Sequence, residues 1–394
     1  MSQQNIRELA GQGNPKAIAS LLNRSLNPKG ITAKVRLRGE CLHVLLESEQ
    51  VQNEYTLIMF IHKKMINLGV EGIINLVKVS GYHLGSKNPD WTQYIELKNP
   101  FLNFKVRSLV LGYIIILLLL VFILIFILFG VIGYRSDLNI DEPIVALFLG
   151  LLVYSLLYLW ALERFRQLDI NYQRLMGNLP SNYHWLPTVG LVVPVLLFST
   201  GTFYLSHYLL SFFAPSLVES ILNQKLFLSA SETSAPILYN LFMIFVSVIV
   251  APVTEEFFFR GIILHRWAAK WGMRSALIAS SLLFGFLHNN FLGLSVFGLV
   301  MALLYLKTRT LIVSITCHAL NNAAGTFLGL LPILSGSAET VYTVEQFRSD
   351  WWWGVLYVVL SAPWLIHFIY KNWPNPRSPA PYFVNASQFT NHFN

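Results

Sequence analysis

The amino-acid sequence predicts an all-α polytopic membrane protein with about eight transmembrane helices, preceded by a small α+β soluble domain. Two observations predict this class. Of the 394 residues, 54% are hydrophobic and only 12% are charged, whereas a soluble domain carries about 25% charged residues. The apolar residues form long runs after residue 108, while residues 1–104 are polar with short periodic segments. The abundant aromatic residues and the low charge also exclude an intrinsically disordered chain.

The net charge of +8 lies mostly before the first apolar run. Residues 1–107 hold 14 Lys and Arg against 8 Asp and Glu. We find no basic run interleaved with aromatic residues, so the charge does not indicate a nucleic-acid partner. Cations flanking a membrane span on the cytoplasmic side explain it better. Cys41 and Cys317 lie in very different contexts, which excludes a disulfide framework.

The soluble domain, residues 1–104, is predicted from helix and strand periods that follow one another. Asn14 and Pro15 are typical of a helix start, and apolar and polar residues then alternate with the strand period of two. The predicted elements are a helix after Pro15, strands at 31–38 and 41–47, a helix closed by Gly69, and a third strand at 73–79. This α-β-β-α-β order resembles a small module of cyanobacterial proteins, and nothing in it indicates catalysis.

Eight apolar runs follow, and about 20 apolar residues suffice to cross a bilayer. The fifth and sixth are short and share a tight connection at Asn289 and Asn290, so they could form one helical hairpin that does not fully cross. The predicted spans are 109–132, 144–162, 187–213, 236–262, 275–289, 292–306, 310–331 and 351–370.

Cations in the connecting loops predict the orientation of these spans. With a cytoplasmic N-terminus, the inside loops carry Arg164, Arg166, Arg174, Arg266, Lys270, Arg274, Lys307, Arg309, Lys371 and Arg377. The outside loops carry only Arg135, Lys225 and Arg348. This positive-inside bias places both termini in the cytoplasm. We therefore divide the chain into the soluble domain, an eight-helix domain at 105–373 and a proline-rich tail at 374–394 that is predicted to be disordered.

Only two acidic residues lie inside an apolar core, and they are adjacent: Glu255 and Glu256. A charge at membrane depth costs about 2.5–3.5 kcal/mol on insertion scales, so such residues are candidates for function. Arg260 follows Glu256 by four residues, in the favourable order for a helical ion pair. Because Glu255 lies about 100° round the helix from Glu256, it is predicted to face another surface.

Polar residues in two further spans are predicted to meet Glu255. His288 ends the fifth span, and His318 lies in the seventh with Asn322 one turn later on the same face. Three helices can therefore direct Glu255, His288 and the pair His318 and Asn322 at one cavity. Each of the three alone could instead hold helices together through hydrogen bonds.

Three short strings resemble motifs of one family. Residues 255–261, EEFFFRG, resemble the EExxxR motif of the CAAX protease and bacteriocin-processing (CPBP, or Abi) family of intramembrane endopeptidases. Residues 284–288, FGFLH, resemble its FxxxH motif, and residues 318–322, HALNN, resemble its HxxxN motif. All three occur in order on apolar spans within about 236–331. No HExxH, GxSG or GD string points to another class of intramembrane protease.

The resemblance implies a membrane endopeptidase that cleaves a protein or peptide substrate. Glu255 is then the general base for a water that His288 orients, and the family assigns oxyanion stabilisation to His318 and Asn322, which fits their donor chemistry. Glu256 and Arg260 are predicted to be a supporting pair. This mechanism requires no cofactor or metal.

Three alternatives stay open at this stage. Glu255 and the two histidines form a His₂Glu set, which zinc accepts. The chain could also be a transporter or proton path, or a non-catalytic membrane scaffold. The predicted partners are membrane lipids and a substrate, and the predicted location is the plasma membrane, or the thylakoid membrane in a cyanobacterium.

Overall fold

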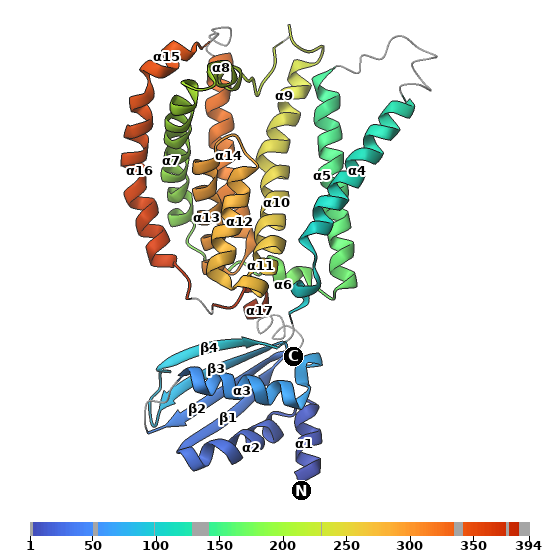
Figure 1. Ribbon diagram of the computed structural model, residues 1–394, viewed down its shortest axis with the longest axis vertical. Helices are drawn as coiled ribbons and strands as arrows, with labels where there is room; N and C mark the ends of the chain where they lie inside the picture. The colour runs from blue at the N-terminus through green and yellow to red at the C-terminus, as the bar shows by residue number, and fades with distance from the viewer. Residues whose placement is uncertain are drawn as a thin grey trace.

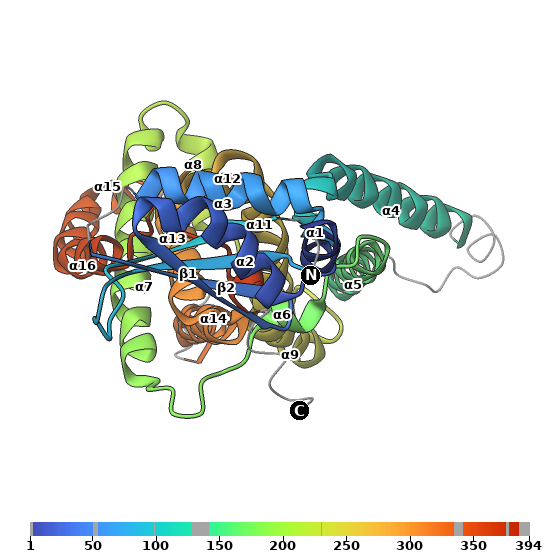
Figure 2. The same ribbon diagram turned by 90° about the horizontal axis from the view of Figure 1, so that it is seen from below.

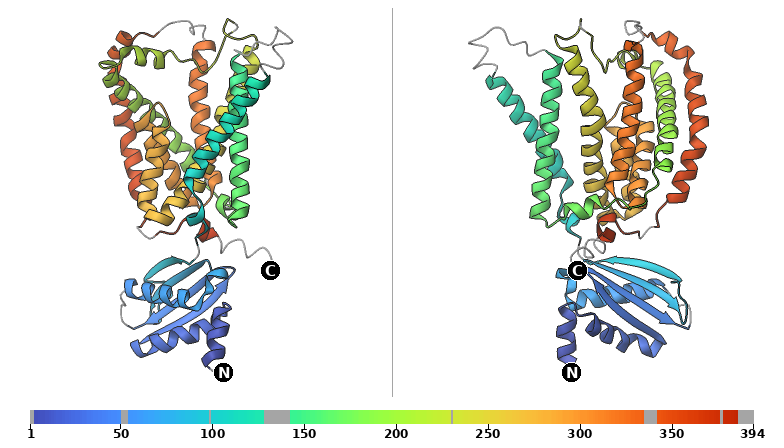
Figure 3. Two further views of the ribbon diagram at one scale, coloured as in Figure 1. Left: turned by 45° about the vertical axis from the view of Figure 1, so that its right-hand side comes forward. Right: turned by 180° about the vertical axis from the view of Figure 1, so that it is seen from behind.

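A bundle of long helices and a small sheet domain lie end to end (Figure 1). This computed structural model describes residues 3–49, 54–97, 99–127, 142–229, 231–334, 342–375 and 378–385. The sheet domain comes first in the chain, and its N-terminal helix lies farthest from the bundle (Figures 1 and 3).

Over its described residues, the sheet domain contains four strands in the order β1-β2-β3-β4. The outer pairs, β1 with β2 and β3 with β4, are antiparallel, whereas the central pair β2 and β3 is parallel. A parallel pair needs a crossover connection, and α3 provides it across the same face that α2 covers (Figure 1). The elements are α1 (Gln3–Gly11), α2 (Pro15–Leu26), β1 (Ile31–Arg38), β2 (Cys41–Ser48), α3 (Glu54–Leu68), β3 (Leu76–His83) and β4 (Trp91–Glu96), with short 3₁₀ turns at Asn27–Lys29, Val70–Gly72 and Pro100–Asn103.

This domain has the expected α+β character and two elements more than the sequence predicts. The additional elements are α1 and the edge strand β4. The apolar signal of β4 is weak, because Ile95 is its only buried residue. The Asn14 cap of α2 is confirmed: its side chain accepts hydrogen bonds from the backbone N–H of Lys16 and Ala17, at 3.1 and 3.2 Å.

Among the residues that the structure describes, six helices are long and apolar enough to cross a membrane. They span Pro143–Gln167, Leu186–Ser211, Pro236–Trp271, Phe291–Thr308, Leu311–Leu331 and Trp351–Asn372. The predicted class of a mostly helical membrane protein with a small α/β region is therefore found, but the count of eight spans is not confirmed.

The two remaining predicted spans, α12 and α4, are not among these six helices, for different reasons. Met273–Phe286 (α12) has 14 residues, or about 21 Å, which is shorter than the roughly 30 Å hydrocarbon core. In α4 (Val106–Ile127) the apolar stretch found is Val106–Leu120, and the predicted continuation to residue 132 passes beyond the described residues. α4 packs beside α5 at one edge of the bundle, opposite α16 (Figure 2).

The helices of the bundle follow in chain order. They are α5 (Pro143–Gln167), α6 (Tyr172–Met176), α7 (Leu186–Ser211), α8 (Pro215–Leu222), α9 (Pro236–Phe245), α10 (Ala251–Glu256), α11 (Leu264–Trp271), α13 (Phe291–Thr308), α14 (Leu311–Leu334), α15 (Val344–Ser349), α16 (Trp351–Asn372) and α17 (Pro381–Asn385). Two π-helical segments, η5 (Val246–Val250) and η6 (Phe257–Ile263), join α9, α10 and α11 into one continuous helix.

Helix α17 corrects the prediction that the whole tail is disordered. All five of its residues are buried, at the end of the bundle that faces the sheet domain (Figure 1). Asn385 donates hydrogen bonds to the carbonyl oxygens of Arg174 and Arg309, at 2.9 and 2.8 Å. The prolines suggested disorder, but Tyr382, Phe383 and Val384 supply enough apolar surface to pack. Residues 376–377 and 386–394 lie outside the described residues.

The junction between the sheet domain and the bundle combines aromatic packing with an ion pair. The ring of Phe101 stacks on His265 of α11 with centroids 4.8 Å apart and meets Tyr382 edge-on at 5.2 Å. Arg174 pairs with Glu40 at 2.6 Å. These contacts hold the sheet domain against the bundle by aromatic packing and an ion pair.

Glu96, at the end of β4, makes this junction sensitive to pH. Burial raises the pKa of Glu96 from an ordinary value of 4.5 to about 7, although hydrogen bonds from Ala380 and Asn99 lower it. The docked arrangement therefore favours the protonated acid. Its contribution to docking is fully present below pH 4.5 and is lost as the pH rises through 7.

We expect the distribution of distances between spin labels on α3 and α11 to broaden when the pH is raised from 5 to 8. Labels can be placed on exposed cysteines introduced there, because Cys41 and Cys317 are buried. Glu96→Gln should remove most of the pH dependence, whereas Glu49→Gln, at an exposed site, should keep it. An identical pH response in all three proteins would contradict the assignment to Glu96.

Candidate active site

The two adjacent glutamates lie between the π-helical segments of the long third spanning helix. Glu255 and Glu256 end α10, and η5 and η6 flank it on either side. A π-helical turn rotates the side chains that follow and leaves backbone groups without their usual partners, and such turns occur often at functional sites. Both glutamates therefore lie on a helix whose irregular turns coincide with the polar residues.

Glu256 and Arg260 form the ion pair that their spacing predicts. Their side chains are 0% and 3% exposed, and an Arg260 nitrogen lies 3.0 Å from a Glu256 oxygen. Arg260 also donates a hydrogen bond to the carbonyl oxygen of Gly298 on α13, at 3.0 Å, and its guanidinium lies 4.7 Å from the ring centre of Phe284. This buried pair therefore connects the long helix to α12 and α13.

His318 lies between the two glutamates, a placement that the sequence did not predict. Its Nδ1 lies 2.9 Å from Glu256 Oε1, and its Nε2 lies 3.8 Å from Glu255 Oε2. A hydrogen bond to a carboxylate assigns the proton to Nδ1. Glu256 therefore orients His318 as well as pairing with Arg260, and the opposite ring nitrogen faces Glu255.

His288 approaches Glu255 from the turn that follows α12. Its Nδ1 donates to the carbonyl oxygen of Phe284 at 2.6 Å, which leaves Nε2 free and 4.0 Å from Glu255 Oε2. The shortness of α12 brings this turn to the level of α10, as a hairpin that does not fully cross would require. The predicted convergence of Glu255, His288 and His318 is thus seen in the structure.

The two Nε2 atoms therefore face one Glu255 oxygen at 3.8 and 4.0 Å. These distances exceed a direct hydrogen bond and suit a group bridged by one water molecule. Glu255 and His288 are also the accessible members, with side chains 20% and 31% exposed, whereas His318 is 4% exposed. The buried His318 therefore holds the arrangement in place, and Glu255 and His288 are accessible from outside the bundle.

Asn322 lies one turn beyond His318 on α14, but its amide binds elsewhere. Its Nδ2 donates to the carbonyl oxygen of Ser247 at 2.9 Å. Ser247 belongs to η5, where the π-helical geometry makes a carbonyl available. Asn322 thus ties α14 to the long helix, and one N–H of its amide is left for another acceptor.

The sequence left a His₂Glu zinc set open as an alternative to the metal-free mechanism. Within the part of the chain that the structure describes, no three or more His, Cys, Asp or Glu side chains are placed to hold a metal ion. One ring nitrogen of His318 is already bonded to Glu256, and one of His288 to a backbone carbonyl. The donors that remain are Nε2 of each histidine and the Glu255 carboxylate.

A comparison with protein families bears on this site. Residues 236–324 match the family model described as Rce1-like, type II CAAX prenyl endopeptidase Rce1-like. This segment belongs to the Rce1-like family. No curated protein and no solved structure matches the chain. The Rce1-like segment contains all six predicted site residues, and it excludes the sheet domain and α16.

Sequence reasoning missed the contacts that orient the site. The bond between Glu256 and His318 joins residues 62 positions apart, and no local pattern reveals it. Asn290, at the turn after α12, donates to the carbonyl oxygen of Ser199 on α7 at 2.7 Å and caps α13 through Gly293. The paired asparagines at 289 and 290 predicted the turn but not this anchor.

We expect Glu256→Ala to lower the free energy of unfolding by about 3–5 kcal/mol, because it leaves Arg260 as an uncompensated buried charge. Denaturant titration in mixed micelles measures this loss. Glu163→Ala is the matched control, since Glu163 pairs with Arg166 on the surface of α5, where both side chains are more than half exposed, and should cost less than about 1 kcal/mol. Equal losses would contradict a buried ion pair.

Proposed function

We propose that the chain is an intramembrane endopeptidase of the CAAX-processing type that hydrolyses a peptide bond with a water activated by Glu255 and His288. One observation carries the proposal: a Glu255 oxygen faces Nε2 of both histidines across a gap suited to one water. The family match of residues 236–324 supports an endopeptidase of this kind.

The proposed reaction begins with the water between Glu255 and His288. Glu255 accepts a proton from it as general base, while the free Nε2 of His288 orients its second hydrogen. The resulting hydroxide attacks the substrate carbonyl carbon. The tetrahedral intermediate then collapses with cleavage of its C–N bond, and Glu255 passes the proton to the leaving amine nitrogen, so the carboxylate is regenerated after each cycle.

The carbonyl oxygen becomes negative during the attack and needs hydrogen-bond donors. In our proposal His318 donates from Nε2 when both its ring nitrogens carry protons, and Asn322 donates its remaining N–H. Glu256 holds the ring in this orientation, because its carboxylate accepts a hydrogen bond from Nδ1 at 2.9 Å. Loss of one oxyanion donor of this kind costs about 10²–10³ in rate.

The site lies at moderate depth from the end that faces the sheet domain. His318 is seven residues into α14, or about 10 Å along the helix. We propose a cavity open to the cytoplasm, with both termini on that side, and a substrate that is a membrane-associated protein or a peptide. The membrane is the plasma membrane, or the thylakoid membrane in a cyanobacterium.

Glu255→Gln is expected to lower cleavage about 10²–10⁴-fold, because it removes the general base and keeps the shape of the side chain. Comparison of the membrane proteins and released peptides in cells that express wild type or variant measures this. Glu219→Gln, on exposed α8, is the control and should cleave normally. Unchanged products with Glu255→Gln would refute the mechanism, and ion flux without cleavage would favour a transporter.

The second test separates the water-activating mechanism from a zinc enzyme. We expect the purified protein to retain cleavage after dialysis against a strong chelator, since the proposed chemistry needs only side chains. The measurement is the rate before and after dialysis, and after added zinc. Loss on chelation with recovery by zinc would show that the Glu and His cluster works through a metal.

A further inference from the structure

Two adjoining pockets lie at the end of the bundle that faces the sheet domain, away from Glu255. The first is a groove of about 530 Å³ between α7 and α16, whose walls include Leu197, Leu360 and Trp364. The second, of about 340 Å³, lies between β4, the end of α13 and the segment before α17. Lys307 and Asn372 line both pockets, so the pockets are neighbours.

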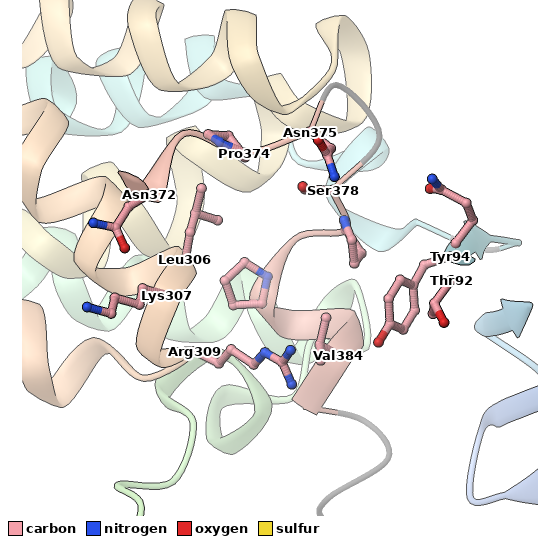
Figure 4. A pocket seen from close by; sticks show the side chains of 13 residues that line it. Thr92, Tyr94, Leu306, Lys307, Arg309, Asn372, Pro374, Asn375, Ser378 and Val384 are labelled. Atoms are coloured by element: carbon pink, nitrogen blue, oxygen red, sulfur yellow. The ribbon is translucent and has the colours of Figure 1, made fainter. Parts of the chain in front are cut away.

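The charge around these pockets is positive. Lys307 and Lys371 line the groove, and Lys307 and Arg309 line the second pocket. No Asp or Glu is among the described residues that line either pocket. Over the described ranges these three cations form no salt bridge. Figure 4 shows the Arg309 side chain extending into the second pocket toward Tyr94 and Val384.

The groove is apolar along the part of the bundle that would meet lipid, and it is cationic at the end of the bundle that faces the sheet domain. Trp364 is 70% exposed on its wall, and Lys307 and Lys371 belong to the last turns of α13 and α16. An apolar channel that leads to unpaired cations at a membrane surface matches a lipid with a negative headgroup. Both volumes fall in the range of small-molecule sites.

We propose that the two pockets together bind one anionic phospholipid. An acyl chain lies in the groove between α7 and α16, and the phosphate lies at Lys307 and Lys371. The headgroup occupies the second pocket beside Arg309 and β4. The lipid therefore contacts the sheet domain and the bundle at the same time, and its binding strengthens their junction. This inference does not depend on the proposed peptidase activity.

The first test compares lipids on the full chain in mixed micelles. We expect phosphatidylglycerol to raise the unfolding temperature in proportion to its concentration, and phosphatidylcholine to have much less effect. Glycerol phosphate without acyl chains should not replace the lipid. Equal stabilisation by the two lipids would overturn the charge argument, and full stabilisation by glycerol phosphate would overturn the role of the groove.

The second test removes the cations. Each cation near anionic lipid contributes about 1 kcal/mol, so Lys307→Gln should weaken phosphatidylglycerol binding about fivefold, and the double variant with Lys371→Gln about thirtyfold. Lys270→Gln is the matched control: Lys270 is also an exposed cation over an aromatic ring at a helix end, but it lines neither pocket. An equal loss with Lys270→Gln would show general attraction to the membrane and refute the site.

The third test fills the groove and leaves every charge in place. Gly190 lines the groove, and a side chain built there meets open space, so Gly190→Leu should fold and reduce lipid binding at least tenfold. Gly150→Leu, on α5 with equally open surroundings, should bind normally. Unchanged binding by Gly190→Leu, with a normal unfolding temperature in the absence of lipid, would overturn the proposal.

Discussion

The buried chain of contacts from Arg260 through Glu256 to His318 is the constraint on which the site depends. Taking two charges out of water is costly, and the cost is met only when geometry is good and further hydrogen bonds are made. Here Arg260 reaches the Gly298 carbonyl, and Glu256 reaches His318. Because these partners lie on α13 and α14, the charges can be buried only when three helices are in register. The same register holds His318 toward Glu255.

The sequence predicts the membrane class and the residues of the candidate site better than it predicts the contacts between those residues. The scarcity of charged residues predicted a helical membrane protein, and the two adjacent glutamates at 255 and 256 marked the site. The ion pair with Arg260 follows from helix spacing alone. The position of His318 between both glutamates does not, because it depends on how α14 crosses α10. Likewise, the apolar runs predicted eight spans and marked the fifth and sixth as short, but they left open whether the fifth, α12, crosses the membrane.

Two irregular features give the site its geometry. The π-helical turns around α10 lie where Asn322 meets a backbone carbonyl of η5, and the early end of α12 brings His288 to the glutamates. An ideal helix in either place would shift these groups, so regularity is given up where polar residues must converge. The pattern of hydrophobic residues does not reveal such irregular turns and helix ends. The geometry of the site could therefore not be predicted from the sequence.

Helix α17 has a consequence for the order of assembly. Its five residues follow every membrane helix in the chain, yet they lie against the sheet domain, α6 and the connection after α13. The sheet domain leaves the ribosome before the bundle and can fold early, but its contact with the bundle cannot be completed until α16 is inserted and the segment behind it emerges. Closure of the junction therefore follows the insertion of α16, and it distinguishes a chain in which α16 is inserted from one in which it is not.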